Sequence, residues 1–303
     1  MTGSGWTSFL TRPATLGRNV GKRILHRRGL SIVRATTFEP LDLSDHAMDP
    51  IEAAHQANGK PFIMPVRLAD CRTLGMNGFP CSRNSGDPLV NTLAGYARGE
   101  TRSYEGSPLE KFYARWQPAT WAEAAGVARC LNSRLHVQLD DPPPWPWGAE
   151  YAEGDTRHER LLRPGFQEAL AASGVGTRDV QGSLYFGPVN RHFGDATLRR
   201  LFEVFDSICA EGYHPERFAG GHIRARVLVR EGDYRLLIEG GKHRIAALTA
   251  LDYQSVPILF THQPVLIHRC DAGSWPNVRR GLYSQSEGRV VFDRLFEGRQ
   301  PWD

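Results

Sequence analysis

The residue types best suited to chemistry stand together in one short run, Gly-Gly-Lys-His-Arg at positions 240–244. An apolar segment, residues 236–238, precedes this run, and an Ala-rich segment with helical character follows at 245–251. The pattern predicts a strand, a glycine turn and a helix N-terminus. The first N–H groups of a helix have no intrahelical partner and carry the positive end of the helix dipole. The turn therefore predicts a site for an anion such as phosphate.

Each residue of the turn has a role in such a site. Gly240 and Gly241 allow a positive φ and a close approach of the ligand to the backbone. Arg244 offers a planar fork suited to phosphate, and Lys242 offers a point charge. His243 can donate a hydrogen bond or act as an acid or base near neutral pH. The alternative is an ordinary tight turn whose charged side chains are solvated.

The longer run Glu239-Gly-Gly-Lys-His-Arg-Ile-Ala-Ala-Leu, followed by Leu-Asp-Tyr-Gln-Ser-Val-Pro-Ile at 251–258, resembles the nucleotide-binding core of the ParB/sulfiredoxin superfamily. Its Gly-Gly-x-His-Arg form is closer to sulfiredoxin and the free-serine kinases than to the Gly-Glu-Arg-Arg form of chromosome-partitioning ParB. Lys242 stands where sulfiredoxin has its reactive cysteine, so sulfinic-acid reductase activity is not expected.

The resemblance covers residues 182–260 and implies a small mixed sheet with helices that binds ATP or CTP with Mg²⁺. It places Asn190 and Arg191 in the nucleotide pocket. The free-serine kinases use a glutamate near the start of the fold as a base, and no glutamate aligns there in this chain. Glu239 and His243 are the candidate catalytic residues, although Glu239 could instead hold Lys242 or Arg244 in place. No metal ligand is assigned.

The segments around the turn have clear periodicity. Leu198 to Cys209 form a helical stripe, for which Asp195 is the predicted cap. Two strand-like runs at 223–229 and 234–238 are joined by Glu-Gly-Asp in a hairpin-like turn. A last helix is predicted over 286–296.

The N-terminal half indicates a mixed α/β domain over residues 36–140. Helix starts are predicted at Asp49, Ser107 and Thr120, and a proline-bounded strand at 61–68. The region from Cys71-Arg72 to Arg83–Asp87 is predicted to be a polar loop, with either a structural or a substrate-binding role.

A proline-rich run, Asp-Asp-Pro-Pro-Pro-Trp-Pro-Trp-Gly, begins a predicted linker and helical connection at residues 141–181. Consecutive prolines hold an extended conformation and cannot continue a helix. Trp145 and Trp147 are expected to dock this linker against a domain, rather than to recognise a ligand. A helix broken at Pro164 is predicted within 157–173.

Residues 1–35 contain seven Lys and Arg side chains and no Asp or Glu. Leu16 to Arg28 have the spacing of a basic amphipathic helix, which suits peripheral contact with an anionic membrane surface. A disordered basic tail or a helix packed on its own domain fits the same residues. The predicted compartment is the cytoplasm, in part because the five cysteines form no Cys-x-x-Cys pair.

The 303 residues, 41% of them hydrophobic, and the formal charge of +4 are typical of a soluble globular protein. The predicted fold class is α+β, with the nucleotide-binding domain at 182–303. Three functions fit the sequence. They are a kinase or triphosphatase that acts on a nucleotide and a small-molecule acceptor, a nucleotide-binding regulator of envelope or polysaccharide assembly without turnover, and a ParB-type DNA-associated protein. No DNA-reading helix pair is evident in the sequence, so DNA is the least favoured partner.

Overall fold

The computed structural model describes residues 39–303, except 128–132, 137–142, 149–182, 219 and 262–263. The predicted basic segment 1–35 and the predicted helix at 157–173 lie outside the described residues. Residues 40–303 belong to one compact unit.

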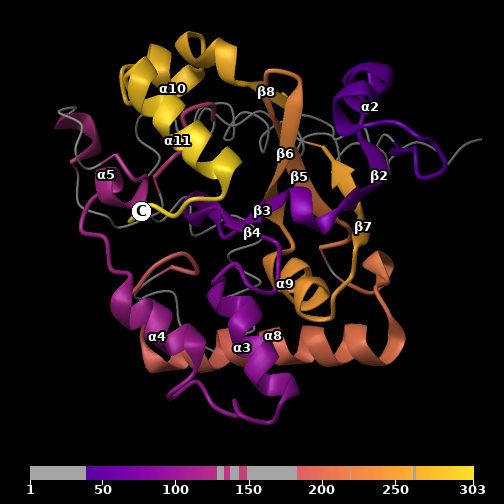
Figure 1. Ribbon diagram of the computed structural model, residues 1–303, viewed down its shortest axis with the longest axis vertical. Helices are drawn as coiled ribbons and strands as arrows, with labels where there is room; N and C mark the ends of the chain where they lie inside the picture. Colours follow the sequence, from indigo (N-terminus) through magenta and orange to yellow (C-terminus); the bar gives the residue numbers. More distant parts are fainter. Residues whose placement is uncertain (1–38, 128–132, 137–142, 149–182, 219, 262–263) are drawn as a thin grey trace, which may run out of the picture. The chain divides into compact units, whose positions relative to one another are not determined.

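An eight-stranded mixed sheet lies at the centre of this unit (Figure 1). The strand order is β1-β2-β7-β5-β6-β3-β4, and β8 also pairs with β5. The strands are β1 (Leu41–Asp42), β2 (Phe62–Arg67), β3 (Cys71–Thr73), β4 (Phe79–Pro80), β5 (Ile223–Arg230), β6 (Asp233–Gly240), β7 (Ser255–Phe260) and β8 (Leu266–His268). The protein is therefore a mixed α/β fold, in agreement with the predicted class. Strands from the predicted domains 36–140 and 182–303 share this one sheet.

Helices cover both faces of the sheet (Figure 1). On one face lie α2 (Pro50–Ala57), α3 (Pro88–Ala97), α4 (Pro108–Arg115), α8 (Arg191–Glu211) and α9 (Lys242–Ala250). On the other lie α5 (Trp121–Ala124), α10 (Pro276–Arg279) and α11 (Gln285–Glu297). The central strands alternate between the two cores, because Leu236 and Ile238 join the first core and Leu237 joins the second. A strand buried on both faces reads as a continuous apolar run.

Most predicted helix starts are confirmed by their caps. Asp49 accepts hydrogen bonds from the first turn of α2, Ser107 from Glu110 N in α4, and Thr120 from Glu123 N in α5. The hairpin between β5 and β6 is also present, with Glu231 and Gly232 at positive φ. The predicted order of helix, strand, strand, helix and Val-Pro strand is found as α8, β5, β6, α9 and β7.

Two local predictions are wrong. The long helix begins at Arg191 rather than after Asp195, because the side chain of Asn190 accepts a hydrogen bond from Phe193 N at 2.8 Å and caps it. Cys71 and Arg72 lie in a buried strand rather than a polar loop, since β3 pairs with β6 on one side and with β4 on the other. The sequence of this segment is polar because it contains Arg72. The guanidinium of Arg72 donates to the backbone oxygens of Ala69 and Cys71.

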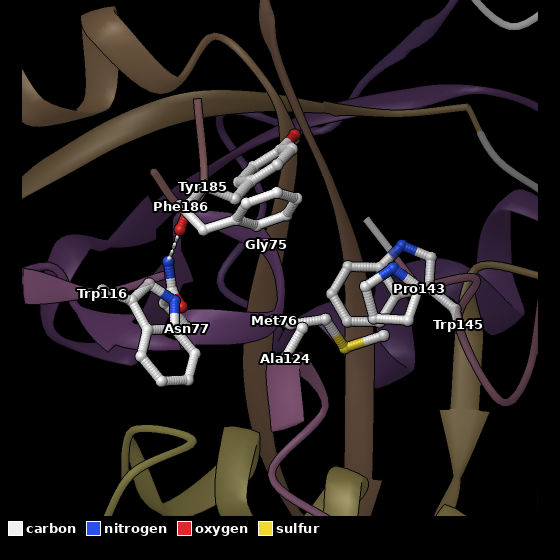
Figure 2. Close-up of a pocket in the computed structure, with 9 residues that line it drawn as sticks. All are labelled: Gly75, Met76, Asn77, Trp116, Ala124, Pro143, Trp145, Tyr185 and Phe186. Carbon is white, nitrogen blue, oxygen red and sulfur yellow. Dashed lines mark hydrogen bonds between the residues drawn. The ribbon is translucent and has the colours of Figure 1, made fainter. Parts of the chain in front are cut away.

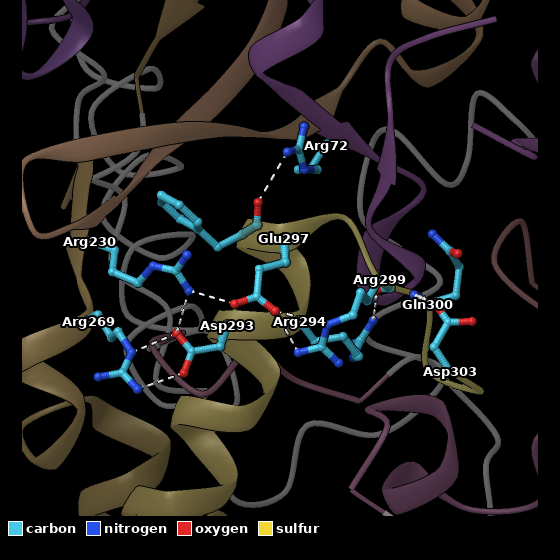
Figure 3. A network of polar contacts seen from close by, with 10 residues as sticks. Arg72, Arg230, Arg269, Asp293, Arg294, Glu297, Arg299, Gln300 and Asp303 are labelled. Carbon is cyan, nitrogen blue, oxygen red and sulfur yellow. Dashed lines mark hydrogen bonds and ion pairs between the residues drawn. The ribbon is translucent and has the colours of Figure 1, made fainter. Parts of the chain in front are cut away.

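Charged side chains attach α11 to the sheet (Figure 3). Arg269 donates to both oxygens of Asp293 at 2.6 and 2.7 Å, and Arg230 reaches Asp293 at 3.3 Å and Glu297 at 2.8 Å. Burial acts to raise the pKa of Asp293, but the hydrogen bonds from the two arginines outweigh it and hold this pKa below its ordinary value. Paired, partly buried charges of this kind fix the position of a helix more firmly than exposed pairs do.

Over the ranges that the structure describes, no helix combines the length and the hydrophobicity needed to cross a membrane.

Candidate functional site

The turn between β6 and α9 has the backbone that the glycines predict, with one difference. Gly241 has a φ of +87° and is the N-cap of α9, whereas Gly240 is not among the residues with positive φ. No side-chain cap bond is formed at Gly241, and the first turn of α9 contains no acidic residue. The helix begins at Lys242, three residues before the predicted Ala-rich segment. Its first N–H groups, at Lys242, His243 and Arg244, are therefore available to an anion.

Cationic side chains and one histidine, from three elements, lie close enough to this helix N-terminus to influence one another. Lys242, His243 and Arg244 come from α9, Arg200 from α8 and Arg224 from β5. Burial lowers the pKa of Arg244, and the charges of Arg224 and Arg200 lower it further. Such a concentration of positive charge destabilises the cations and would be relieved by a bound anion.

Arg244 is held firmly in place. It is 8% exposed, its Nη1 donates to the backbone oxygen of Gly221, and its guanidinium lies 5.2 Å from the centre of the Phe218 ring. Gly241 must be a glycine for this packing, since a Cβ there would come within 2.9 Å of Arg244 Nη2 and of Ile223 Cγ1.

His243 is neutral near physiological pH. Burial, reinforced by the charges of Arg200, Lys242 and Arg244, lowers its pKa to about 3. Its Nε2 atom is buried and has no hydrogen-bond partner within the described part of the chain. A buried polar atom without a partner is costly, and burial of this nitrogen favours the neutral ring. As a neutral ring, His243 can donate or accept a hydrogen bond.

Glu239 forms a buried ion pair instead of facing the turn as a free base. Arg226 Nε lies 3.0 and 3.1 Å from its two carboxylate oxygens, and the Arg226 side chain is 4% exposed. A bulge makes this pair possible, because Arg224 is opposite Gly240 and Ala225 is opposite Ile238, so that Glu239 is the extra residue. Bulges commonly re-aim a side chain in this way.

Glu239 helps to position Lys242 through the backbone carbonyl group of Glu239. Lys242 Nζ donates to the Glu239 carbonyl oxygen at 2.9 Å and lies 5.2 Å from the centre of the Tyr185 ring.

Asn190 and Arg191 lie at the N-terminus of α8. Asn190 caps the helix, and Arg191 Nη2 is 3.3 Å from Glu105 Oε2. The residue of α8 that influences His243 is Arg200, almost three turns further along. Sequence reasoning did not identify Arg200 or Arg224, since neither belongs to a motif. The helical periodicity of α8 is the one signal that could have identified Arg200, because this residue is adjacent to the apolar stripe of the helix.

Asn277 is buried and its Nδ2 donates to the Trp145 carbonyl oxygen at 2.7 Å, so Asn277 holds the proline-rich segment in place. Trp147 is 2% exposed and packs against Trp275 and Phe292, which confirms the expected docking.

Comparisons with protein-family models, with curated proteins and with solved structures give no significant match.

Proposed function

We propose that this protein binds a nucleoside triphosphate, ATP or CTP, at the turn 240–244 and transfers or hydrolyses its terminal phosphate. The observation that carries the proposal is the convergence of five cationic or titratable side chains on a helix N-terminus that lacks a side-chain cap. Four of these groups are cations, Lys242 and three arginines, and their charge matches that of a polyphosphate. The sequence resemblance to the ParB/sulfiredoxin superfamily agrees with this reading.

Each group has a defined task in this proposal. The backbone N–H groups after Gly241 bind phosphate oxygens, and Arg244 and Lys242 neutralise their charge. His243 donates a hydrogen bond to one oxygen from its neutral ring. Catalysis of phosphate transfer would consist mainly of positioning and charge neutralisation. The acceptor is a small hydroxylated molecule or water.

Mg²⁺ fits the proposal as part of the nucleotide complex. This ion prefers oxygen ligands, keeps several waters and is commonly held by substrate phosphates. Among the described residues no group of three or more His, Cys, Asp and Glu side chains is arranged for a metal. We therefore propose that the ion enters with the phosphates.

The ion pair of Glu239 with Arg226 favours a second candidate, a nucleotide-binding regulator without turnover. A carboxylate held at 3.0 Å by a buried guanidinium is a weak base. In this reading the nucleotide binds and stays intact, and the basic segment 1–35 is the candidate membrane contact.

Phosphorus NMR separates the two candidates. The full-length protein is mixed with Mg²⁺ and ATP, CTP or GTP, with and without a pool of small hydroxylated metabolites. A new diphosphate or phosphoester signal would establish turnover, whereas line broadening of intact nucleotide would establish binding alone.

Matched variants of α8 and α9 test the site itself. R200A and H243A should weaken nucleotide binding at least tenfold, while R199A should leave it unchanged because Arg199 is exposed on the same helix. Melting curves without nucleotide control for folding. Unchanged binding in both R200A and H243A would rule out the proposed site.

A further inference from the structure

A small cavity lies next to the candidate phosphate site, at the same edge of the sheet. β3 and β6 are parallel neighbours, with Cys71 opposite Leu236 and Arg72 opposite Leu237. Their carboxyl ends therefore emerge side by side, β6 into the turn at Gly240 and β3 into the short helix Gly75–Asn77. Ligands of α/β sheets commonly bind at the carboxyl ends of parallel strands.

Four of the nine residues that line this cavity are aromatic, and its volume is about 80 Å³. Figure 2 shows Tyr185 and Phe186 on one side and Trp145 on the other. The lining side chains with a role in the argument are Met76, Asn77, Trp116, Trp145, Tyr185 and Phe186. Flat aromatic walls and a thioether favour a flat apolar ring over a branched aliphatic group.

The backbone beneath the cavity is strained. Leu74 has a φ of +61°, a left-handed conformation that is rare for residues other than glycine, and Gly75 follows it with a φ of +59°. A Cβ at Gly75 would lie 2.9 Å from Tyr185 Cε1, so glycine is needed for the Tyr185 ring to lie against the cavity. Strain of this kind concentrates at ligand sites.

Asn77 provides a polar group in an otherwise apolar lining. It is 2% exposed, and its Nδ2 donates to the Tyr185 carbonyl oxygen at 2.8 Å (Figure 2). This bond fixes the orientation of the amide. The side-chain carbonyl oxygen accepts no hydrogen bond from the described residues, so it is free to accept one from an N–H or O–H group of a ligand.

Tyr185 is shared by the cavity and the phosphate site. One part of its ring lines the cavity, and Lys242 Nζ lies 5.2 Å from its centre. A ligand with a ring and a phosphate group could therefore contact both.

We propose that this cavity binds one flat six-membered ring, edge first, beside the phosphate turn. Size sets the limit, because a cavity of about 150 Å³ accepts a whole benzene molecule, so a cavity of about 80 Å³ takes only the edge of one ring. A fused purine is the poorer fit. The placement of the ring beside a phosphate rests on the proposed function, whereas the ring site itself rests on the cavity alone. The ring belongs either to the nucleotide, as a pyrimidine base, or to a separate aromatic alcohol that accepts the phosphate.

The test uses saturation-transfer NMR and titration with four probes: CTP, ATP, inorganic tripolyphosphate and benzyl alcohol. The central variant is A124L, since Ala124 lines the cavity and is 3% exposed, so that a leucine fills the space. A114L is the matched control, because Ala114 is exposed on α4. Should A124L fail to fold, W145L removes one wall instead.

The outcomes distinguish the two sources of the ring. With a pyrimidine base, CTP binds at least tenfold more tightly than tripolyphosphate or ATP, and A124L removes this advantage while tripolyphosphate binding persists. With a separate acceptor, CTP and ATP bind alike, and benzyl alcohol shows saturation transfer that A124L abolishes and A114L does not.

Two results would overturn the proposal. One is ring binding that survives both A124L and W145L. The other is saturation transfer to the adenine ring of ATP that A124L abolishes. Failure of tripolyphosphate to bind would instead count against the proposed phosphate site, and the benzyl alcohol arm would still decide the ring site.

Discussion

Asp87 is the residue whose burial has the clearest measurable consequence. It caps α3 by accepting a hydrogen bond from Leu89 N at 2.8 Å, and it is completely buried. One of its oxygens, Oδ2, has no partner among the described residues. Burial outweighs the cap bonds and raises the pKa of Asp87 to about 6. The native protein therefore holds this proton more tightly than the unfolded chain does.

The expected effect of D87N is a change in the pH dependence of stability. The contribution of Asp87 is fully present below its unfolded pKa near 4 and is lost as pH rises through about 6. Asparagine keeps the cap and cannot ionise. Between pH 4 and pH 8 the free energy of unfolding of D87N should therefore improve relative to wild type by about 2 kcal/mol. Urea denaturation at both pH values measures this.

D49N is the matched control for this prediction. Asp49 caps α2 with the same pattern of hydrogen bonds but is exposed to solvent. Because Asp49 is not buried, D49N should lack the relative gain in stability at pH 8 that burial predicts for D87N. Equal pH profiles for D87N and wild type would contradict the account of Asp87.

The buried pair of Arg226 and Glu239 gives a second prediction for single residues. E239Q leaves the Arg226 guanidinium buried without a carboxylate, which is expected to cost about 3–5 kcal/mol. The double variant R226M/E239L removes both charges and should be less destabilised than E239Q. Urea denaturation of the wild type and the two variants measures both losses, and a loss in the double variant equal to or greater than that in E239Q would contradict the expected cost of the unpaired guanidinium.

At the scale of elements, the turn between β6 and α9 depends on Gly241 for two separate reasons. Its φ of +87° disfavours any side chain, and a Cβ would meet Ile223 and an Arg244 guanidinium that Gly221 and Phe218 already hold. Arg244 therefore has little freedom to move away from a Cβ at position 241.

G241A should accordingly cost more than an ordinary glycine replacement. G232A is the control, because Gly232 has a φ of +83° in the hairpin but its Cβ would meet nothing within 4 Å. We expect G232A to destabilise by about 1 kcal/mol and G241A by about 1–2 kcal/mol more. G241A should also weaken tripolyphosphate binding, while G232A should not. Similar losses for the two variants would mean that the crowding at Gly241 is relieved without cost.

At the scale of the whole molecule, the sheet joins segments that are far apart in the chain. β2 pairs with β7 along six residue pairs, and β3 pairs with β6. The strands β5 to β8 are thus flanked on both sides by strands from the N-terminal half. The two halves also share their cores, since Phe62 stacks on Phe260 with ring centres 4.7 Å apart.

A fragment of residues 182–303 is therefore not expected to fold alone. Without β2 and β3 both edges of its sheet would be open and its apolar faces exposed. The fragment should show no cooperative thermal transition, whereas the full chain should, and co-expression with residues 36–140 should restore the transition in part. A cooperative melt of the isolated fragment would show that these residues fold as an independent domain.

Local elements were predictable because their signals are local. The caps at Asp49 and Ser107, the hairpin turn at Glu231-Gly232 and the glycine turn before α9 each depend on residues close in sequence. The wrong cap at Asp195 has the same origin, since Asn190 offers an equally good cap and only packing decides between them.

The sequence by itself thus determined the strand, turn and helix that form the candidate site, together with its cationic residues Lys242 and Arg244. Tertiary structure decided which distant groups join them. Arg200 and Arg224 reach the turn, and Glu239 pairs with Arg226, because of a strand register and a helix packing that no local pattern specifies. The cavity beside Tyr185 likewise depends on tertiary structure, because Asn77 and Tyr185, which line it and share a hydrogen bond, are 108 residues apart in the chain.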